Sequence, residues 1–294
     1  MEAMFDQQRS KSESASSRTC LLGVPYDAHS SFLRGPAGAP TEVRRVLHGG
    51  SANYWTELGV EVDPARWTDL GDLDLPGDVE PTLDRIAEAS AGITADGGRL
   101  LSIGGDHMVT WPLVKGVAAN HRGLTIVHFD AHPDLYDELD GDRHSHACPF
   151  ARIMEEGLAD RLVQIGIRTM TSHQLEQVER FGVEVHELRT WDGRLPGDLA
   201  GPVYVTIDMD ALDPAFAPGV SHHEPGGMTT RQLVDCLHQL ATMAAADGIE
   251  VVAADIVEIN PERDIHDITA MVGAKLVREL LGVLILPSPS PTFS

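Results

Sequence analysis

The stretch HFDAHPDLYD, residues 128–137, places Asp130, His132 and Asp134 at every second position directly after an apolar run. In a β-strand, side chains at i, i+2 and i+4 point to the same face, so two carboxylates and an imidazole would converge there. Like charges at this spacing repel one another, and carboxylates held near an apolar strand end require cations or protons in compensation. The stretch therefore indicates a site that binds cations.

Three other apolar runs also lead directly into side chains of this kind. They are RLLSIGG before Asp106 and His107, VYVTI before Asp208 and Asp210, and VVAADIV before Glu258. A dense group of carboxylates with few imidazoles suits divalent metal ions that prefer oxygen, and bridging carboxylates suit a pair of such ions. Together the four runs predict a dinuclear metal site.

Each motif taken alone has a simpler explanation. GGDH is compatible with a glycine turn in which Asp106 caps a helix. The DxD pair at Asp208 and Asp210 occurs often by chance, and Asp213 before Pro214 is typical of a turn. The metal site is favoured because DxHxD, DxDxxD and GGDH all occur in one chain, each after an apolar run.

The runs that carry these residues alternate with helical patterns. We predict strands at 19–26, 99–105, 124–132, 161–168, 183–188, 203–210 and 251–259, and helices at 81–93, 150–160 and 229–248. The last helix begins with a capping-box pattern from Thr229 to Gln232. Strand and helix in alternation predict an α/β fold, with a parallel sheet covered by helices on both faces. In such sheets, ligands bind beyond the carboxyl ends of the strands.

Composition indicates the domain organisation, the location and the partners of the chain. The 294 residues, 42% of them hydrophobic, favour one large domain over 19–286, between polar tails at 1–18 and 287–294 that we expect to be loose. The chain has no apolar run of membrane-spanning length and no signal-peptide pattern, so a cytoplasmic location is expected. The net charge of −23 argues against nucleic acid and anionic membranes as partners, and is compatible with a small cationic substrate.

From about Gly23 to Gly282 the chain resembles the ureohydrolases, which include arginases, agmatinases and their relatives. The resemblance rests on GGDHMVT (104–110), DAHPDLYD (130–137), SHACPFARI (145–153), IDMDALDPAFAPG (207–219), EPGGM (224–228) and DIVEINPERD (255–264). It implies a three-layer α/β/α fold with a central parallel β-sheet, the arginase-like fold. It also implies two Mn²⁺ ions per subunit, with another divalent metal as an alternative, and a homo-oligomer that is a trimer or hexamer.

By motif position, the resemblance implies a ligand set for each ion. The ligands of one ion are His107, Asp130, Asp134 and Asp208, and those of the other are His132, Asp130, Asp208 and Asp210, so that Asp130 and Asp208 bridge. Three roles in catalysis follow in the same way. Asp134 orients the attacking water, Glu258 holds the guanidinium, and His146, with an ordinary pKa, transfers a proton to the leaving amine.

The resemblance favours agmatine as substrate, which would yield urea and putrescine. Tyr136 stands where arginases carry an Asn that helps to grip the substrate carboxylate, and His222 and His223 fall in a loop expected beside the substrate. The alternatives are guanidinobutyrate, guanidinopropionate, guanidine or formiminoglutamate. A non-catalytic regulator of the same fold is the least favoured alternative, because all six ligand positions hold residues able to bind metal.

Overall fold

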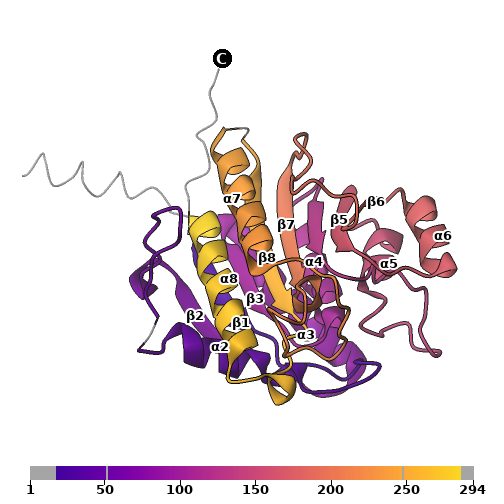
Figure 1. Cartoon of the computed structure of the whole chain (residues 1–294), viewed down its shortest axis with the longest axis horizontal. Coiled ribbons are helices and arrows are strands. Elements are labelled where there is room, and N and C mark those ends of the chain that lie inside the picture. Colours follow the sequence, from indigo (N-terminus) through magenta and orange to yellow (C-terminus); the bar gives the residue numbers. More distant parts are fainter. Residues whose placement is uncertain (1–17, 51, 247, 286–294) are drawn as a thin grey trace, which may run out of the picture.

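The computed structural model describes residues 18–50, 52–246 and 248–285, and its strands form one eight-stranded sheet (Figure 1). The strands are β1 (Thr19–Gly23), β2 (Thr68–Asp72), β3 (Arg99–Ile103), β4 (Thr125–Phe129), β5 (Arg161–Ile167), β6 (Glu184–Glu187), β7 (Pro202–Asp208) and β8 (Glu250–Val257). Their order across the sheet is β2-β1-β3-β8-β7-β4-β5-β6, and every neighbouring pair is parallel. The predicted parallel α/β fold is confirmed.

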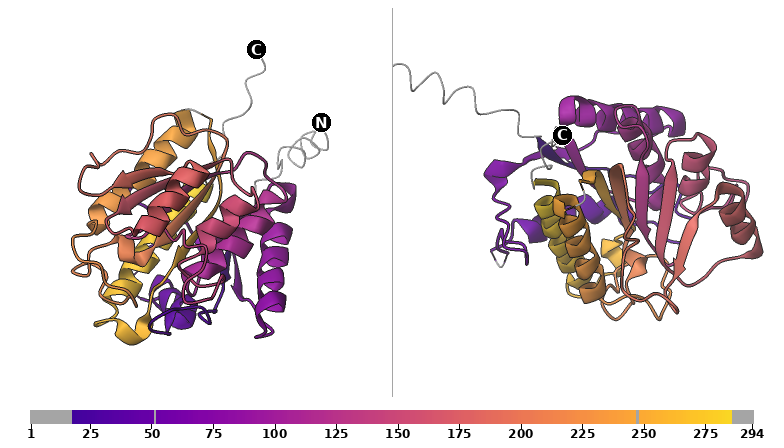
Figure 2. Two further views of the ribbon diagram at one scale, coloured as in Figure 1. Left: turned by 90° about the vertical axis from the view of Figure 1, so that its right-hand side faces the viewer. Right: turned by 90° about the horizontal axis from the view of Figure 1, so that it is seen from above.

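Helices cover both faces of this sheet, as the view from above shows (Figure 2). One face carries α2 (Ala39–Leu47), α7 (Thr230–Ala246) and α8 (Ile268–Ile285). The other carries α3 (Val79–Thr94), α4 (Thr110–Ala118), α5 (Pro149–Glu155) and α6 (Ser172–Phe181). Of the helices in the described part of the chain, none is long and apolar enough to cross a membrane.

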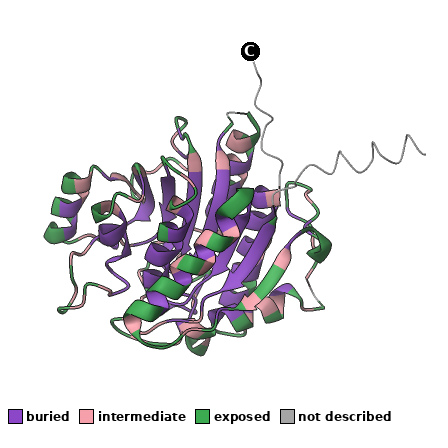
Figure 3. Cartoon of the chain, turned by 180° about the vertical axis from the view of Figure 1, so that it is seen from behind, coloured by how far each residue is buried: buried purple, intermediate pink, exposed green. Residues whose placement is uncertain are grey.

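The sheet separates two hydrophobic cores. Neighbouring residues of one strand alternate between them, so that Leu101 belongs to the core under α2, α7 and α8 while Leu100 belongs to the core under α3 and α4. Val127 and Ile126 divide in the same way on β4. The central strands are therefore buried on both faces (Figure 3), which explains why they are continuous apolar runs in the sequence.

The element predictions can be compared with the structure one by one. All seven predicted strands are present, although several end earlier than predicted. The capping box is confirmed, since the backbone N–H of Gln232 donates to Thr229 Oγ1 at 3.1 Å and that of Thr229 donates to Gln232 Oε1 at 2.9 Å. The helix predicted over 150–160 was too long. It ends at Glu155, because Gly157 adopts φ +62° and turns the chain towards β5.

The predicted loose tails, 1–18 and 287–294, lie outside the described residues except for Arg18.

Candidate active site

Four adjacent strands bring the predicted site residues together at one edge of the sheet. β3, β8, β7 and β4 are consecutive in the sheet order, and each supplies its polar residues at or just beyond its carboxyl end. β3 leads to His107, β8 to Glu258, β7 to Asp208 and Asp210, and β4 to Asp130, His132 and Asp134.

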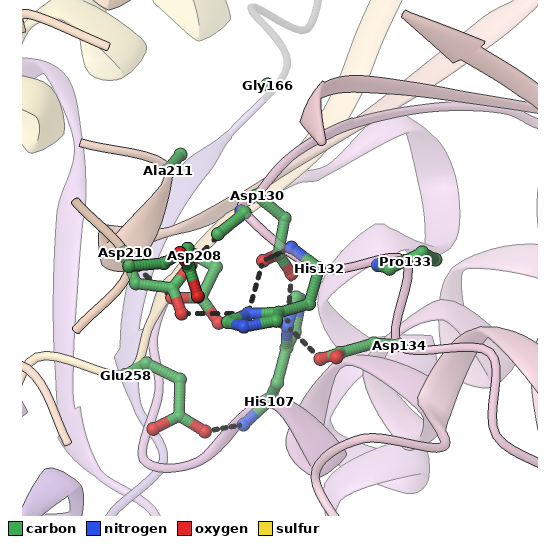
Figure 4. Close-up of polar contacts among 12 residues, drawn as sticks. His107, Asp130, His132, Pro133, Asp134, Gly166, Asp208, Asp210, Ala211 and Glu258 are labelled. Carbon is green, nitrogen blue, oxygen red and sulfur yellow. Dashed lines mark hydrogen bonds and ion pairs between the residues drawn. The ribbon is translucent and has the colours of Figure 1, made fainter. Parts of the chain in front are cut away.

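The side chains of DAHPD converge through a turn, and not through strand alternation as predicted. β4 ends at Phe129, and Asp134 adopts φ +48°, a left-handed conformation that is uncommon for residues other than glycine. The turn is held by the backbone N–H of His132, which donates to Asp130 Oδ1 at 2.6 Å. As a result, Asp134 Oδ2 lies 2.9 Å from His107 Nδ1 (Figure 4).

Three groups of possible metal ligands among the described residues share Asp130, and two of these groups consist wholly of predicted ligands. The first group has four members, each offering an atom within 4.8 Å of the others: His107, Asp130, Asp134 and Asp208. In this group, His107 Nδ1 lies 3.3 Å from Asp130 Oδ2 and 3.2 Å from Asp208 Oδ2. In the second, His132 Nδ1 lies 3.1 Å from Asp210 Oδ2 and 3.5 Å from Asp130 Oδ1.

Asp208 belongs to the first of these two groups. Its Oδ1 accepts the backbone N–H of Asp210 at 2.9 Å, and the second group contains Asp130, His132 and Asp210. Bridging by Asp208 therefore stays a prediction.

The chemistry of these residues fits divalent cations. His107 Nδ1 is buried and makes no hydrogen bond, although three carboxylate oxygens surround it. Burial raises the pKa of Asp208 well above its ordinary value, and the charges of Asp210 and Asp130 raise it further. Such shifts indicate negative charge that the protein leaves uncompensated. Carboxylate oxygens with two imidazole nitrogens are ligands that Mn²⁺ accepts.

Glu258 and His146 form a buried pair beside the ligand groups. Glu258 adopts φ +62°, and its Oε1 accepts the backbone N–H of His107 at 2.9 Å and lies 2.8 Å from His146 Nδ1. Its other oxygen, Oε2, is buried and has no hydrogen-bond partner. The second ring nitrogen of His146, Nε2, lies 2.8 Å from Ser31 Oγ. Glu258 therefore keeps one oxygen free for a ligand.

The expectation of an ordinary pKa for His146 was wrong. Burial alone would lower the pKa, but the charge of Glu258 and its hydrogen bond outweigh burial and raise the pKa of His146 to about 9. The imidazole is therefore protonated at neutral pH in the free protein.

A cavity of about 210 Å³ opens above these residues. Two of the predicted substrate residues, Tyr136 and His222, line this cavity. It is also lined by Asp134, Asp208, Asp210, His146 and Glu258. The ring of His222 lies 4.8 Å from that of His146 between centroids. His223 does not line the cavity; it is exposed, and its Nε2 donates to the carbonyl oxygen of Pro218 at 2.8 Å.

Sequence reasoning missed three residues at this site: Ser31, His128 and Gln164. His128 Nε2 lies 2.8 Å from Asp130 Oδ2, and Gln164 Nε2 lies 3.1 Å from His128 Nδ1. The position of His128 two residues before Asp130 was a usable signal, because it continues the same spacing. Gln164 lies within an apolar run, and Ser31 within a polar loop, so neither gave a signal.

Comparison with known proteins identifies the family to which the chain belongs. A sequence model described as the arginase family matches residues 17–282. The chain belongs to the arginase family, as the ureohydrolase resemblance predicted.

Particular members are similar along most of their length. The chain is 46% identical over 283 residues to "Arginase 1, mitochondrial" of Arabidopsis thaliana, covering 90% of this chain and 81% of that protein. It is 34% identical over 269 residues to the agmatinase of Bacillus anthracis, covering 90% and 91%. Among solved structures, an arginase from Medicago truncatula has a TM-score of 0.84 at 42% identity, covering 95% of this chain and 91% of that one.

These identities bear on the prediction that the chain is more similar to agmatinases than to arginases. The plant arginase is more similar in sequence than the agmatinase. The family is therefore established, while the substrate within the family is a matter for proposal.

Proposed function

We propose that this protein hydrolyses the terminal guanidino group of a small substrate to urea and an amine at a two-manganese centre. The observation that carries the proposal is the pair of ligand groups that share Asp130, at the floor of one cavity and next to the Glu258–His146 pair. When bound, the two ions supply Lewis acidity that makes water a competent nucleophile near neutral pH.

The protein's own side chains then have three tasks. Glu258 accepts N–H bonds from the planar guanidinium, for which its unpartnered Oε2 is available. Asp134 lines the cavity and orients the attacking water through a hydrogen bond. His146, whose Nδ1 lies 2.8 Å from Glu258 Oε1, donates a proton to the leaving nitrogen, which departs as an amine.

Agmatine is the substrate that the cavity favours. Among the described residues that line it, none is Lys or Arg, whereas Glu224 adds a carboxylate to the lining. A cationic amine tail is attracted by this lining, and an α-carboxylate is not. Leaving an α-carboxylate poorly paired costs on the order of 2–5 kcal/mol, or roughly thirty- to several-thousand-fold in kcat/KM.

Arginine is the second candidate, and the 46% identity to a protein named arginase favours it.

The test is urea release by Mn²⁺-loaded protein from agmatine, arginine, guanidinobutyrate, guanidinopropionate and guanidine, with formamide release from formiminoglutamate. We expect the highest kcat/KM for agmatine and no turnover after chelation. An equal or higher value for arginine contradicts the agmatine assignment. A protein with two bound ions that hydrolyses none of these compounds contradicts the proposed function itself.

Three further expectations stay proposals: a single catalytic domain over 19–286, a homo-oligomer of three or six subunits, and a cytoplasmic location. The family resemblance supports the first two. The third rests on the sequence alone, and the Arabidopsis relative has a name that places it in mitochondria. Sedimentation analysis and cell fractionation test the last two.

A further inference from the structure

We propose that Gln164, acting with His128, is a positioning residue that holds the shared ligand Asp130 and the turn bearing His132 and Asp134 in the geometry needed for two metal ions. The inference rests on the metal centre of the proposed function and does not depend on the substrate. Gln164 comes from β5, the strand next to β4, and like His128 it is fully buried.

The side-chain amide of Gln164 makes two contacts through the same nitrogen. Its Nε2 lies 2.7 Å from the carbonyl oxygen of Pro133 and 3.1 Å from His128 Nδ1. A carbonyl oxygen can only accept, so the atom that faces Pro133 must be the NH₂ group of the amide. Its second N–H then points to His128. Both donor positions of this amide are used, while its Oε1 is buried without a partner.

This arrangement fixes the tautomer of His128. Because Nδ1 accepts the N–H of Gln164, the ring proton is on Nε2, and that N–H donates to Asp130 Oδ2 at 2.8 Å. The ring of Phe150, 4.0 Å away between centroids and tilted by 30°, packs against the imidazole and limits its rotation. His128 therefore acts as a directed donor to the carboxylate that both ligand groups share.

The same tautomer excludes His128 as a metal ligand. His107, His128 and Asp130 lie close enough together to be considered a third ligand group. A ring nitrogen ligates a metal through its lone pair, but in His128 the Nε2 lone pair is replaced by a proton and the Nδ1 lone pair is used by Gln164. Its contribution is to orient Asp130.

The contact with Pro133 extends the effect to two more ligands. Pro133 stands between His132 and Asp134, and it has no N–H through which the turn could be held. Its carbonyl oxygen, bound by Gln164, fixes the peptide plane that leads into Asp134, whose φ of +48° is uncommon. One amide group thus fixes the side chain of Asp130 and the backbone before Asp134.

Mn²⁺ affinity of the full-length protein tests the proposal without any substrate. Gln164→Leu removes both donors at similar volume, and Gln177→Leu is the matched control, because Gln177 is also buried but lies on α6, outside the cavity lining. We expect Gln164→Leu to weaken Mn²⁺ binding roughly 10- to 100-fold by calorimetry, and Gln177→Leu to leave it unchanged. A folded Gln164→Leu protein with wild-type Mn²⁺ affinity overturns the proposal.

The tautomer of His128 provides a second measurement that needs no variant. Nitrogen NMR of the full-length protein, free of paramagnetic ions, should show a neutral imidazole with its proton on Nε2. A proton on Nδ1 overturns the proposal even if Gln164→Leu fails to fold. The outcomes are separable from those of the proposed function, because wild-type protein that binds two ions but hydrolyses no guanidino compound contradicts only that function.

Discussion

Asp130 contributes one carboxylate to both groups of predicted ligands, with Oδ2 near His107 and Oδ1 near His132. A side chain in this position would hold two bound ions together. Its surroundings fit that task, because it is fully buried and accepts hydrogen bonds from the backbone N–H of His132 and from His128 Nε2. The consequences of removing it should therefore differ from those of removing a ligand of one ion.

We predict that Asp130→Ala loses both ions, because each group loses a carboxylate, while His107→Ala weakens mainly one. Elemental analysis of Mn²⁺ per chain after dialysis is the measurement. Asp160→Ala, on the surface next to β5, is the control and should keep two ions. An Asp130→Ala protein that retains two ions contradicts the assignment of Asp130 as a bridging ligand.

A second prediction for a single residue concerns proton transfer. His146→Ala should lower kcat roughly ten- to a thousand-fold with Mn²⁺ content unchanged, because it removes a proton donor and no ligand. His144→Ala is a close control, since His144 stacks on Trp111 and does not line the cavity. Steady-state kinetics with the best substrate decide, and wild-type kcat in His146→Ala would assign the proton transfer to another group.

The sequence predicted the side chains of the candidate metal centre better than the side chains that contact them from behind. His107, Asp130 and Asp210 belong to motifs in which polar residues follow an apolar run, so their spacing was informative. Gln164 lies in the middle of β5, surrounded by apolar residues, and its role depends on pairing with β4, which places Gln164 directly beside His128. Strand register is not visible in a single strand, so this contact could not be predicted.

The junction between β3 and the candidate ligand His107 depends on a close approach of two backbones. A Cβ on Gly105 would lie 1.7 Å from the carbonyl oxygen of Tyr26, which accepts the backbone N–H of Asp106 at 2.9 Å. The carbonyl of Gly105 in turn accepts the backbone N–H of Glu258 at 2.9 Å. Gly105 therefore joins three segments that carry site residues.

We predict that Gly105→Ala lowers the free energy of unfolding by about 1–3 kcal/mol or more, because backbone atoms must move to admit the methyl group. Mn²⁺ affinity should fall with it, as His107 shifts. Gly197→Ala is the control, since a Cβ there meets nothing within 4 Å. Urea denaturation of both variants measures the difference, and equal stability of Gly105→Ala and Gly197→Ala would show that the close approach of the two backbones imposes no constraint.

Strand prediction succeeded where the residues form an apolar run and failed where they do not, whereas the helices α2, α4, α6 and α8 were not predicted. The central strands are apolar because helices cover them on both faces, so all were predicted. β2, with the sequence TDLGD, was missed because it lies at the edge of the sheet and is half exposed, which leaves no apolar run. Its pairing with β1 supplies the strand conformation that its own residues do not favour.

For the whole molecule, the acidic site makes stability depend on pH when no metal is bound. Burial and the charge of Glu258 raise the pKa of Asp106 to about 8, and, against the effect of burial, the charge of Glu258 raises the pKa of His146 to about 9. Both groups bind a proton more tightly in the folded chain than in the unfolded chain. Their stabilisation is present at low pH and is lost as the pH rises through the folded-state values.

We therefore predict that the unfolding temperature of metal-free protein falls between pH 6.5 and 9. Each group contributes a slope of roughly 1 kcal/mol per pH unit, Asp106 up to about pH 8 and His146 up to about pH 9. Calorimetric scans across this range measure it, and Asp106→Asn should show a shallower slope. An unfolding temperature that is constant or rises across this range contradicts the prediction.

The strand order also determines when the site can exist during synthesis. β3 and β4, which lead to His107 and to Asp130, are separated in the sheet by β8 and β7, the last two strands to leave the ribosome. β4 can pair with its neighbour β7 once residue 208 has emerged, but β3 has an unpaired edge, of the kind that promotes aggregation, until residue 257 has emerged. In a nascent or prematurely terminated chain, the strands that lead to His107 and to Asp130 are not yet connected through β8 and β7. We therefore expect metal loading to be a late event, and a bound pair of ions would mark a chain whose translation has passed β8.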